Sequence, residues 1–247
     1  MPAVHRTPFR TYRTQSTTHE DLLTYQIVIA ETDLWIASQT DLSTLIADTV
    51  RTLRGQLESY AELHPEFFSS LTPLDPALHA PEIVRRMCMA GKLTGVGPMA
   101  AVAGTIAQMV AEQVQPVSAD VLIENGGDTY LCSTRDRHIG ILPVPGQAVR
   151  VCVPVRAAEF PCSFCASSAT IGHSLSFGNA DLVVTRSKDA ALADAAATAL
   201  ANHLRSAQDM DSVLDMARQW QAIGLDGVFA QCDGKIGIWG QMELAIR

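Results

Sequence analysis

Residues Ala119 to Cys132 read ADVLIENGGDTYLC, two short apolar runs on either side of an Asn-Gly-Gly sequence. Glycine accepts the positive φ angles that a tight reversal requires, so the stretch predicts a strand, a turn and a returning strand. Three oxygen-bearing side chains bracket the turn: Glu124, Asn125 and Asp128. A simple reversal does not need them, which leaves open whether the turn carries a polar site.

Strand pairs of the same kind are expected on both sides of this hairpin. Alternating apolar residues predict a hairpin at residues 24–38, and an Asp-Gly turn predicts another at 225–240. Further strands are expected at 138–144, 148–155 and 181–185. Helices are expected within residues 41–60, 81–91, 98–114, 188–204 and 209–223. Residues 160–180 are expected to form a polar loop. Because strands come in adjacent groups, we predict an α+β fold with a mainly antiparallel sheet packed with helices.

Composition narrows the class of protein. The chain has 247 residues, 47% of them hydrophobic, with no internal repeat, so we expect a single domain over residues 1–247. A net charge of −8 disfavours nucleic acid as a partner. The start, MPAVHRTPFR, lacks the apolar core of a signal peptide, and no apolar run is long enough to cross a bilayer. We therefore expect a cytoplasmic protein that binds neither nucleic acid nor membrane.

The stretch KDAALADAAATALANHL, residues 188–204, holds a carboxylate and a hydroxyl among alanines and leucines. Asp194 and Thr198 are four residues apart, so a helix places them on one face. One interpretation is structural, with Asp194 on the solvated face and Thr198 bonded to the carbonyl one turn back. The other is a Mg²⁺ site, because a hard cation takes carboxylate, hydroxyl and carbonyl oxygens while a phosphate supplies the rest.

A glycine-rich segment precedes the helix expected at residues 98–114. Gly95 and Gly97 stand just before Pro98, where free N–H groups at a helix N-terminus attract anions that glycines allow to approach. We therefore include both glycines among the candidate cofactor-binding residues. The segment is neither a Walker motif nor a dinucleotide fingerprint, and close helix packing explains its small residues equally well.

The stretch CASSATIGHSLSFGNAD, residues 165–181, gathers hydroxyl side chains and a histidine. Ser167 and Ser168 are candidate cofactor-binding residues. His173 is the candidate catalytic base, because imidazole titrates near neutral pH. The structural alternative is a histidine that holds its loop by hydrogen bonds. A Ser/His hydrolase is disfavoured, since the sequence contains no Gly-x-Ser-x-Gly elbow.

Cys162 and Cys165 form a C-x-x-C pair, and four more cysteines are dispersed along the chain. A thioredoxin-like motif belongs at a strand-to-helix junction, and a structural zinc requires a second ligand pair; the sequence offers neither context. We interpret the cysteines as mostly buried thiols. Thiol redox chemistry at Cys162 and Cys165 is an alternative.

These motifs, in this order, resemble those of the ApbE superfamily, whose characterised members are Mg²⁺-dependent FAD:protein FMN transferases. The family motifs are a small-residue helix, Asn-x-Gly-Gly-Asp, a Ser/Thr-Gly loop with a histidine, and an Ala-Asp-Ala-x-Ala-Thr-Ala helix. The corresponding segments here are GPMAAVAGTIA, ENGGD, SSATIGHSLSFG and LADAAATAL, within residues 95–204. The whole chain is more similar still to a smaller, functionally uncharacterised family of ApbE-like proteins, through HPEFFSSLTP, GVGPMAAVAG, ENGGD and GHSLSFGNAD.

The resemblance implies an ApbE-like fold with a site for a cation and a phosphate. Asp194 and Thr198 match the Mg²⁺ ligands of the transferases, a carbonyl from residues 101–103 would add to them, and His173 matches the histidine. Four residues match the Asn-x-Gly-Gly-Asp turn and would shape the pocket: Asn125, Gly126, Gly127 and Asp128. The implied cofactors are Mg²⁺ and either FAD or FMN.

Two departures from the family pattern bear on activity. The lysine of its Ala-Lys-Gly sequence is absent, and the N-terminal segment that helps enclose the flavin has no counterpart before Gly95. We predict an uncharacterised ApbE-like protein that binds a flavin or a related nucleotide diphosphate with Mg²⁺, as a transferase-like enzyme. The alternative is a non-catalytic interaction protein that keeps the fold without the cofactor site. The expected partner is a small molecule, and the alanine-rich core is compatible with a homodimer.

Overall fold

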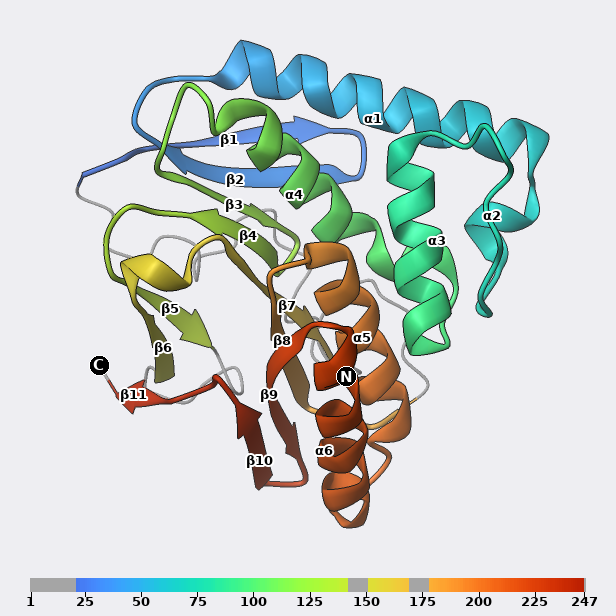
Figure 1. The fold of residues 1–247 in the computed structure, drawn as a ribbon, viewed down its shortest axis with the longest axis vertical. Coiled ribbons are helices and arrows are strands. Elements are labelled where there is room, and N and C mark those ends of the chain that lie inside the picture. The colour runs from blue at the N-terminus through green and yellow to red at the C-terminus, as the bar shows by residue number, and fades with distance from the viewer. Residues whose placement is uncertain (1–20, 142–150, 169–177, 247) are drawn as a thin grey trace, which may run out of the picture.

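A large sheet is the framework of the computed structural model, which describes residues 21–141, 151–168 and 178–246. Within these ranges eight strands follow the order β1-β2-β3-β4-β7-β8-β9-β10, and every neighbouring pair is antiparallel (Figure 1). The strands are β1 (Leu23–Ile29), β2 (Thr32–Ser38), β3 (Val121–Asn125), β4 (Asp128–Cys132), β7 (Cys162–Ser167), β8 (Leu182–Ser187), β9 (Leu225–Cys232) and β10 (Lys235–Gly240). The predicted α+β fold with a mainly antiparallel sheet is confirmed.

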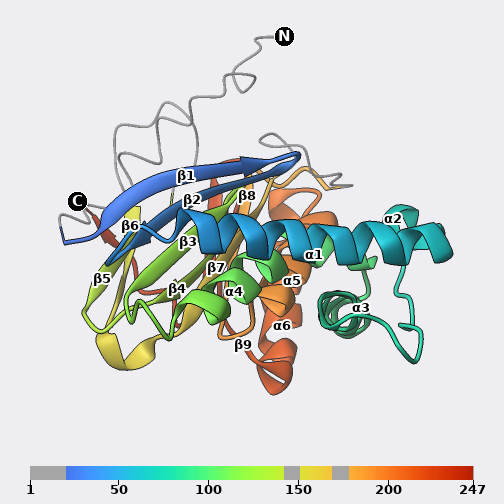
Figure 2. The ribbon, with the colours of Figure 1, turned by 90° about the horizontal axis from the view of Figure 1, so that it is seen from above.

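Helices cover one face of this sheet (Figures 1 and 2). They are α1 (Ser43–Leu63), α2 (Glu66–Ser69), α3 (Glu82–Thr94), α4 (Val102–Val114), α5 (Ala190–His203) and α6 (Met210–Gln219). Four short 3₁₀ turns are η1 (Pro98–Ala101), η2 (Ala157–Glu159), η3 (Ala207–Asp209) and η4 (Trp220–Ile223). The helix α4 packs over β3 and β4 through a cluster that includes Val110 and Ile123, whereas α5 packs over β7 and β8 through one that includes Val183 and Leu200.

A second, three-stranded sheet covers the opposite face. Its strands are β5 (Arg137–Ile141), β6 (Val151–Val155) and β11 (Ala245–Ile246), in the order β11-β6-β5. Figure 1 shows this sheet at lower left, on the side away from the helices. Ile139 and Val153 of the small sheet share an apolar cluster with Phe164 and Phe229 of the large one. The described chain therefore has three layers, with the large sheet in the middle.

The β3–β4 hairpin reverses at Gly126 and Gly127, whose φ angles are 73° and 120°. Side chains with a Cβ rarely adopt such angles, which explains why two glycines occupy the turn. Asn125 pairs with Asp128 in the strand register. The predicted strand, turn and strand are confirmed, and the turn brings these two polar residues to the same end of the sheet.

The helices α4 and α5 lie beside this end of the sheet and approach each other closely at Gly104. A Cβ on Gly104 would lie 2.4 Å from the Ala190 carbonyl oxygen and 2.9 Å from Asp194 Cβ, so no larger residue fits there without movement. Most alanines of α5 are buried within the chain. The alanine-rich surface that suggested a homodimer is therefore used internally, and the homodimer itself stays a prediction.

The prediction of a loop over residues 160–180 is wrong in part. Residues 162–167 form β7, a central strand of the large sheet. Small and polar residues hid the strand in the sequence: Ser163, for example, is fully buried and donates a 2.9 Å hydrogen bond to the Ser187 carbonyl. The described parts of the segments predicted as strands at 138–144 and 148–155 are strands β5 and β6, and residues 142–150 lie outside the described residues.

In the described part of the chain, no individual helix has both the length and the apolarity to cross a membrane. The pair formed by α3 and the segment Pro98–Val114 meets these criteria by length and composition, with a bend of 104° between its two parts.

Candidate functional site

Asp194 is the buried carboxylate at the centre of the candidate site. It lies in the first half of α5, is 8% exposed, and accepts a 2.8 Å hydrogen bond from the backbone N–H of Gly104 in α4. The backbone N–H of Ala103 also donates to it. The interpretation that Asp194 lies on a solvated face is wrong, because Gly104 allows α4 to cover this carboxylate.

A second buried carboxylate, Asp128, lies close enough to Asp194 for their charges to repel. Burial, followed by this repulsion, raises the pKa of Asp194 well above its ordinary value of 3.8, although the N–H groups of Ala103 and Gly104 oppose the shift. Asp128 Oδ1 accepts a 3.1 Å hydrogen bond from the Ala166 N–H of β7. Among the described residues, no lysine, arginine or histidine contributes to the pKa of Asp194. Among the described residues, Asp194 thus has a second carboxylate near it and no cation that lowers its pKa.

Asn125 connects the hairpin turn to the start of α4. Its Nδ2 donates a 3.1 Å hydrogen bond to the Ala103 carbonyl. A carbonyl oxygen has two lone pairs; the first turn of α4 directs the N–H of Ala107 to this carbonyl, and Asn125 takes its second acceptor position. The structure therefore brings together three predicted parts of the site: the turn, the 101–103 segment and the acidic helix.

Ser167, at the end of β7, carries a buried hydroxyl that has no hydrogen-bond partner among the described residues. On β7 it is two residues from Cys165, whose side chain clusters with Ala193 and Ala197 of α5. Because alternate residues of a strand share a face, Ser167 lies on the helix-facing side of the sheet as well. Thr198, the second predicted metal ligand, is half-buried on the same helix. Buried polar atoms are almost always satisfied, so the orphan hydroxyl points to a missing binding partner.

These oxygen atoms fit a hard divalent cation. Carboxylate and hydroxyl oxygens are donor types that Mg²⁺ prefers, and Mg²⁺ usually retains several waters. Within the described ranges, no group of three His, Cys, Asp or Glu side chains could hold a metal by itself. A cation at Asp194 would therefore take its other ligands from hydroxyl and carbonyl groups, from water or from a bound phosphate.

The two predicted cofactor-binding glycines before α4 have structural roles. Gly95 ends α3 in the left-handed conformation, with a φ of 79° that favours glycine. A Cβ on Gly97 would lie 1.8 Å from the Ser70 carbonyl oxygen, so only glycine fits against that backbone. Close packing, the alternative interpretation, therefore explains Gly97 but not Gly95. Their contact with a phosphate stays a prediction.

The remaining predicted residues lie around the end of β7. Ser168 is buried and donates a 2.6 Å hydrogen bond to the Asp181 carbonyl. Its role in cofactor binding stays a prediction. His173 lies outside the described residues, so its role as a base stays a prediction too.

The C-x-x-C pair lacks the geometry of a dithiol. Cys162 and Cys165 are three residues apart on a strand, which separates their Cα atoms by about 10 Å and points their side chains to opposite faces. Cys162 packs towards the small sheet and Cys165 towards α5. A disulfide requires Cα atoms within about 7 Å. Burial raises the pKa of Cys162 to about 12 and that of Cys165 well above its ordinary value. Redox chemistry between these two thiols is therefore excluded.

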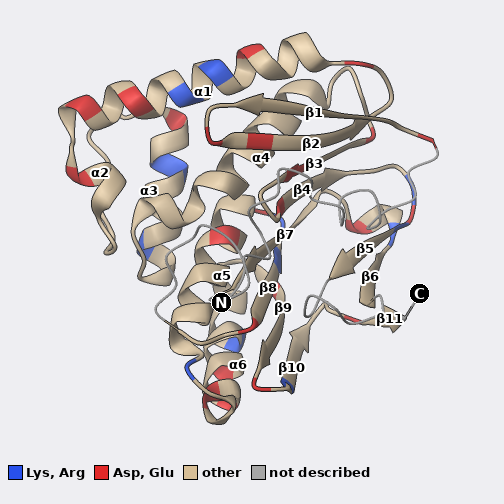
Figure 3. Ribbon diagram, turned by 180° about the vertical axis from the view of Figure 1, so that it is seen from behind, with Lys and Arg blue, Asp and Glu red and all other residues tan. Residues whose placement is uncertain are grey.

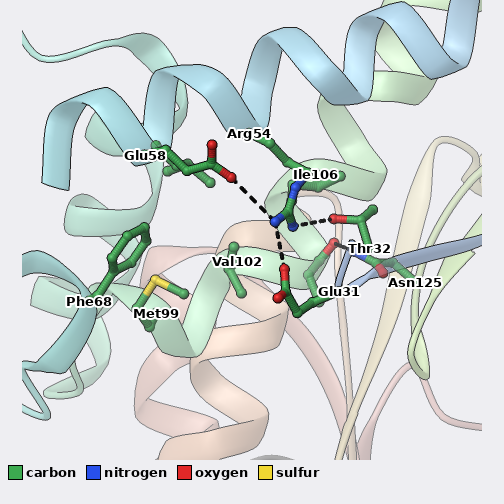
Figure 4. A pocket seen from close by; sticks show the side chains of 11 residues that line it. Glu31, Thr32, Arg54, Glu58, Phe68, Met99, Val102, Ile106 and Asn125 are labelled. Atoms are coloured by element: carbon green, nitrogen blue, oxygen red, sulfur yellow. Dashed lines mark hydrogen bonds and ion pairs between the residues drawn. The ribbon is translucent and has the colours of Figure 1, made fainter. Parts of the chain in front are cut away.

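A cavity of about 280 Å³ lies beside the carboxylates and was not expected from the sequence (Figure 4). The β1–β2 turn, α1, α2 and the start of α4 surround it, and Asn125 and Ala103 form part of its wall. Arg54 of α1 contributes a guanidinium to the same cavity. One feature of the sequence could have indicated this position: Arg54 stands between Leu53 and Leu57, two residues of the apolar stripe of the helix.

Comparison with known proteins identifies the family. The chain matches the sequence family described as "AbpE bacteria" over residues 14–238. The chain belongs to this family. A UPF0280 protein of Methanocella arvoryzae is 35% identical over 225 residues, which are 89% of this chain and 89% of the relative. A UPF0280 protein of Methanocaldococcus jannaschii is 38% identical over 199 residues, 78% of this chain and 80% of the relative. The predicted resemblance to an uncharacterised ApbE-like family is confirmed.

Solved structures share the fold of this AbpE bacteria protein. A mutant of the flavin transferase ApbE from Vibrio cholerae superposes with a TM-score of 0.59 at 12% identity, covering 89% of this chain and 97% of that chain. The apo form of the Pseudomonas stutzeri flavinyl transferase ApbE gives a TM-score of 0.58 at 11% identity, covering 89% and 94%. At such low identity the likeness shows the fold alone, and the predicted ApbE-like fold is confirmed.

Proposed function

We propose that the protein binds FAD, FMN or a related nucleotide diphosphate together with Mg²⁺, and that it is a flavin- or nucleotidyl-transferring enzyme. The observation that carries the proposal is Asp194, a carboxylate buried near Asp128, with no cation among the described residues that act on it and with the buried Ser167 hydroxyl on the same face of the sheet. Burying such a carboxylate opposes folding unless a proton or a bound cation compensates the charge. The fold shared with flavin transferases supports the ligand class.

The chain's own groups have separable roles in this proposal. A Mg²⁺ ion held at Asp194 would supply positive charge that compensates the negative charge of a pyrophosphate. Asp194, Asp128 and Thr198 would hold the ion, and the Gly104 N–H keeps the Asp194 carboxylate oriented. Asn125 fixes the position of the neighbouring peptide carbonyl. His173 would accept the proton of the acceptor hydroxyl, as the sequence predicts.

Ligand-induced stabilisation tests this proposal, because a ligand that binds only the native state raises the melting temperature. FAD, FMN and ADP are each added with and without Mg²⁺ to the full chain and to two variants, Asp194→Asn and Asp215→Asn. The second is a matched control, since Asp215 is an exposed aspartate on α6. We expect Mg²⁺-dependent stabilisation of the wild type and of Asp215→Asn but not of Asp194→Asn. No shift of the wild type with any of these nucleotides would overturn the proposal.

A non-catalytic interaction protein is the second candidate. The missing lysine of the family pattern favours it, and so does the lack of a three-residue cluster of metal-ligating His, Cys, Asp or Glu in the described ranges. Metal-dependent transfer of FMN or a nucleotidyl group, abolished in Asp194→Asn with the fold intact, would rule it out. The cytoplasmic location, the single domain and the exclusion of nucleic acid stay predictions; Figure 3 shows the basic residues of the described chain spread over several elements.

A further inference from the structure

The cavity beside the carboxylates has a size suited to part of a ligand. Its volume of about 280 Å³ is at the lower end of the range for small-molecule sites, enough for a fused ring system and too small for a whole dinucleotide. Asn125 and Ala103 belong both to the cavity wall and to the surroundings of Asp194. A ligand whose phosphates lie at the carboxylates would therefore reach the cavity with its other end.

One wall of the cavity is apolar. Leu57 and Ile106 are buried there, and Met99 and Val102 are partly exposed, with Phe68 at the rim (Figure 4). Apolar and sulfur-containing side chains of this kind suit the face of a planar ring. The apolar wall therefore selects for a flat ligand group but does not orient it.

Arg54 is the inner charged group of the opposite, polar wall. Its side chain is 19% exposed and extends from α1 towards the β1–β2 turn (Figure 4). Nη2 donates to Glu31 at 2.5 Å and to Glu58 at 3.4 Å, and Nη1 donates to the Thr32 hydroxyl at 3.1 Å. A guanidinium has five N–H donors, and three of those of Arg54 have partners among the described residues.

The ion pairs of Arg54 do not compete strongly with a ligand. The side chains of Glu31 and Glu58 are 85% and 61% exposed, and exposed ion pairs contribute little to stability. An acceptor inside the cavity meets the guanidinium where water is largely displaced, and hydrogen bonds from a charged donor are strengthened there.

We propose that Arg54 is a specificity-determining residue that donates hydrogen bonds to carbonyl oxygens on the edge of a planar ring of the ligand, with the face of that ring on Met99, Val102 and Ile106. The inference rests on the proposed function and extends it, because it assigns the residues that would recognise the ring system of the ligand. The ligand class is a fused heterocycle that carries ring carbonyl groups. The elements that supply this site, α1 and the β1–β2 turn, lie before Gly95, where the sequence showed no flavin-enclosing segment.

The test separates the ring from the phosphates. Dissociation constants are measured by calorimetry for FAD, riboflavin and ADP in the presence of Mg²⁺, on the wild type and on Arg54→Met, Arg54→Lys and Arg51→Met. Arg51 is the matched control: it lies on the same helix, is 63% exposed and pairs with Asp48. Melting curves establish that each variant is folded.

We expect Arg54→Met to raise the Kd of FAD and riboflavin by about 10- to 100-fold and to leave that of ADP unchanged. Arg54→Lys should give an intermediate Kd for FAD, since it keeps the charge but loses the planar fork. Arg51→Met should match the wild type. If Arg54→Met binds FAD within about twofold of the wild type, the inference is overturned while the proposed function stands. If the wild type binds ADP but neither FAD nor riboflavin, the inference fails while the proposed function stands; if it binds none of the three, both fail.

Discussion

Two buried aspartates in this molecule, Asp120 and Asp194, have surroundings that shift their pKa values in opposite directions. Asp120 accepts hydrogen bonds from Ser133, from the N–H and hydroxyl of Thr134, and lies 3.5 Å from Arg137. Burial raises its pKa, but these donors and the guanidinium together hold the pKa below its ordinary value. Burial and the nearby Asp128 carboxylate raise the pKa of Asp194, although two backbone N–H groups oppose the shift.

This difference in pKa distinguishes a carboxylate buried for a structural role from one buried at the candidate binding site. At Asp120 the protein itself supplies the cation, and the network ties β5 to the large sheet and, through Arg137, to Asp21. At Asp194 the described residues supply a second carboxylate instead of a cation. A buried carboxylate whose pKa is raised, with no cation near it among the described residues, points to a functional site rather than to a stabilising contact.

The largest expected effect comes from Asp194→Asn. Mg²⁺-dependent transfer should fall by about 100-fold or more, because the substituted amide holds a cation poorly. Free of ligand, the variant should melt at the same temperature as the wild type or higher, since it removes a buried charge. The pKa of Asp194 in the folded state is raised from 3.8. Its carboxyl group therefore leaves the free energy of unfolding unchanged below about pH 3.8 and lowers it increasingly as the pH rises towards the folded-state pKa. The stability of Asp194→Asn relative to the wild type should increase over the same pH range.

Asp120→Asn is the counterpart to this variant. Compared with Asp194→Asn, its effects should be reversed: the melting temperature should fall below that of the wild type, and the rate of the proposed FMN or nucleotidyl transfer should not change. Calorimetric melting at several pH values and a transfer assay measure both variants side by side. A loss of ligand-free stability in Asp194→Asn comparable to that of Asp120→Asn would show that both clusters are structural.

The next effect in size is the removal of the structural cation. Arg137→Met leaves Asp120 buried without its counter-ion, and breaking a buried pair costs about 3 kcal/mol or more of unfolding free energy. Urea denaturation measures the loss. Arg135→Met is the control, because Arg135 is 68% exposed and has a long 3.3 Å contact to the same Asp21. Equal stabilities of the two variants would contradict the role of Arg137.

A smaller effect concerns the outer carboxylate of the structural cluster. The hydrogen bonds from Arg137 lower the pKa of Asp21 from 3.8 to about 2. A lowered pKa contributes stability above pH 3.8 that is lost as pH falls through about 2, so the wild type should lose about 1 kcal/mol in this window. Asp21→Asn should show a flatter dependence. Urea denaturation between pH 2 and pH 5 measures it, and parallel curves would rule out the contribution.

The smallest expected effect is at the thiol beside the binding site. Burial, with repulsion from Asp128 and Asp194, raises the pKa of Cys165, so the thiolate is absent at neutral pH. In native protein treated with iodoacetamide, peptide mass spectra should show Cys165 unmodified. Under mild oxidation, the number of free thiols in Cys162→Ser should stay constant, at one fewer than in the wild type. Rapid alkylation of Cys165, or a disulfide with Cys162, would contradict the buried placement of the pair.

Much of the fold was predictable from local patterns. The two glycines of ENGGD allow the positive φ angles that a tight turn requires, whatever the rest of the fold. The alternation of apolar and polar residues on both sides of residues 31–33 is likewise a local pattern that predicts a hairpin. The strand β7 was not predictable, because the burial of Ser163 and the other small residues depends on the neighbouring strands and on α5. Likewise, nothing in the sequence says that Gly97 faces Ser70 rather than a ligand.

The sequence by itself determined the hairpin, the alanine-rich helix and the family to which the chain belongs, because each rests on short-range spacing or on ordered motifs. Tertiary structure alone decided that Asp128 faces Asp194, that Gly104 closes α4 over them, and that Arg54 enters the adjoining cavity. The physical reason is that burial and charge repulsion are properties of neighbours in space. Residues far apart along the chain acquire them only when the sheet and helices pack.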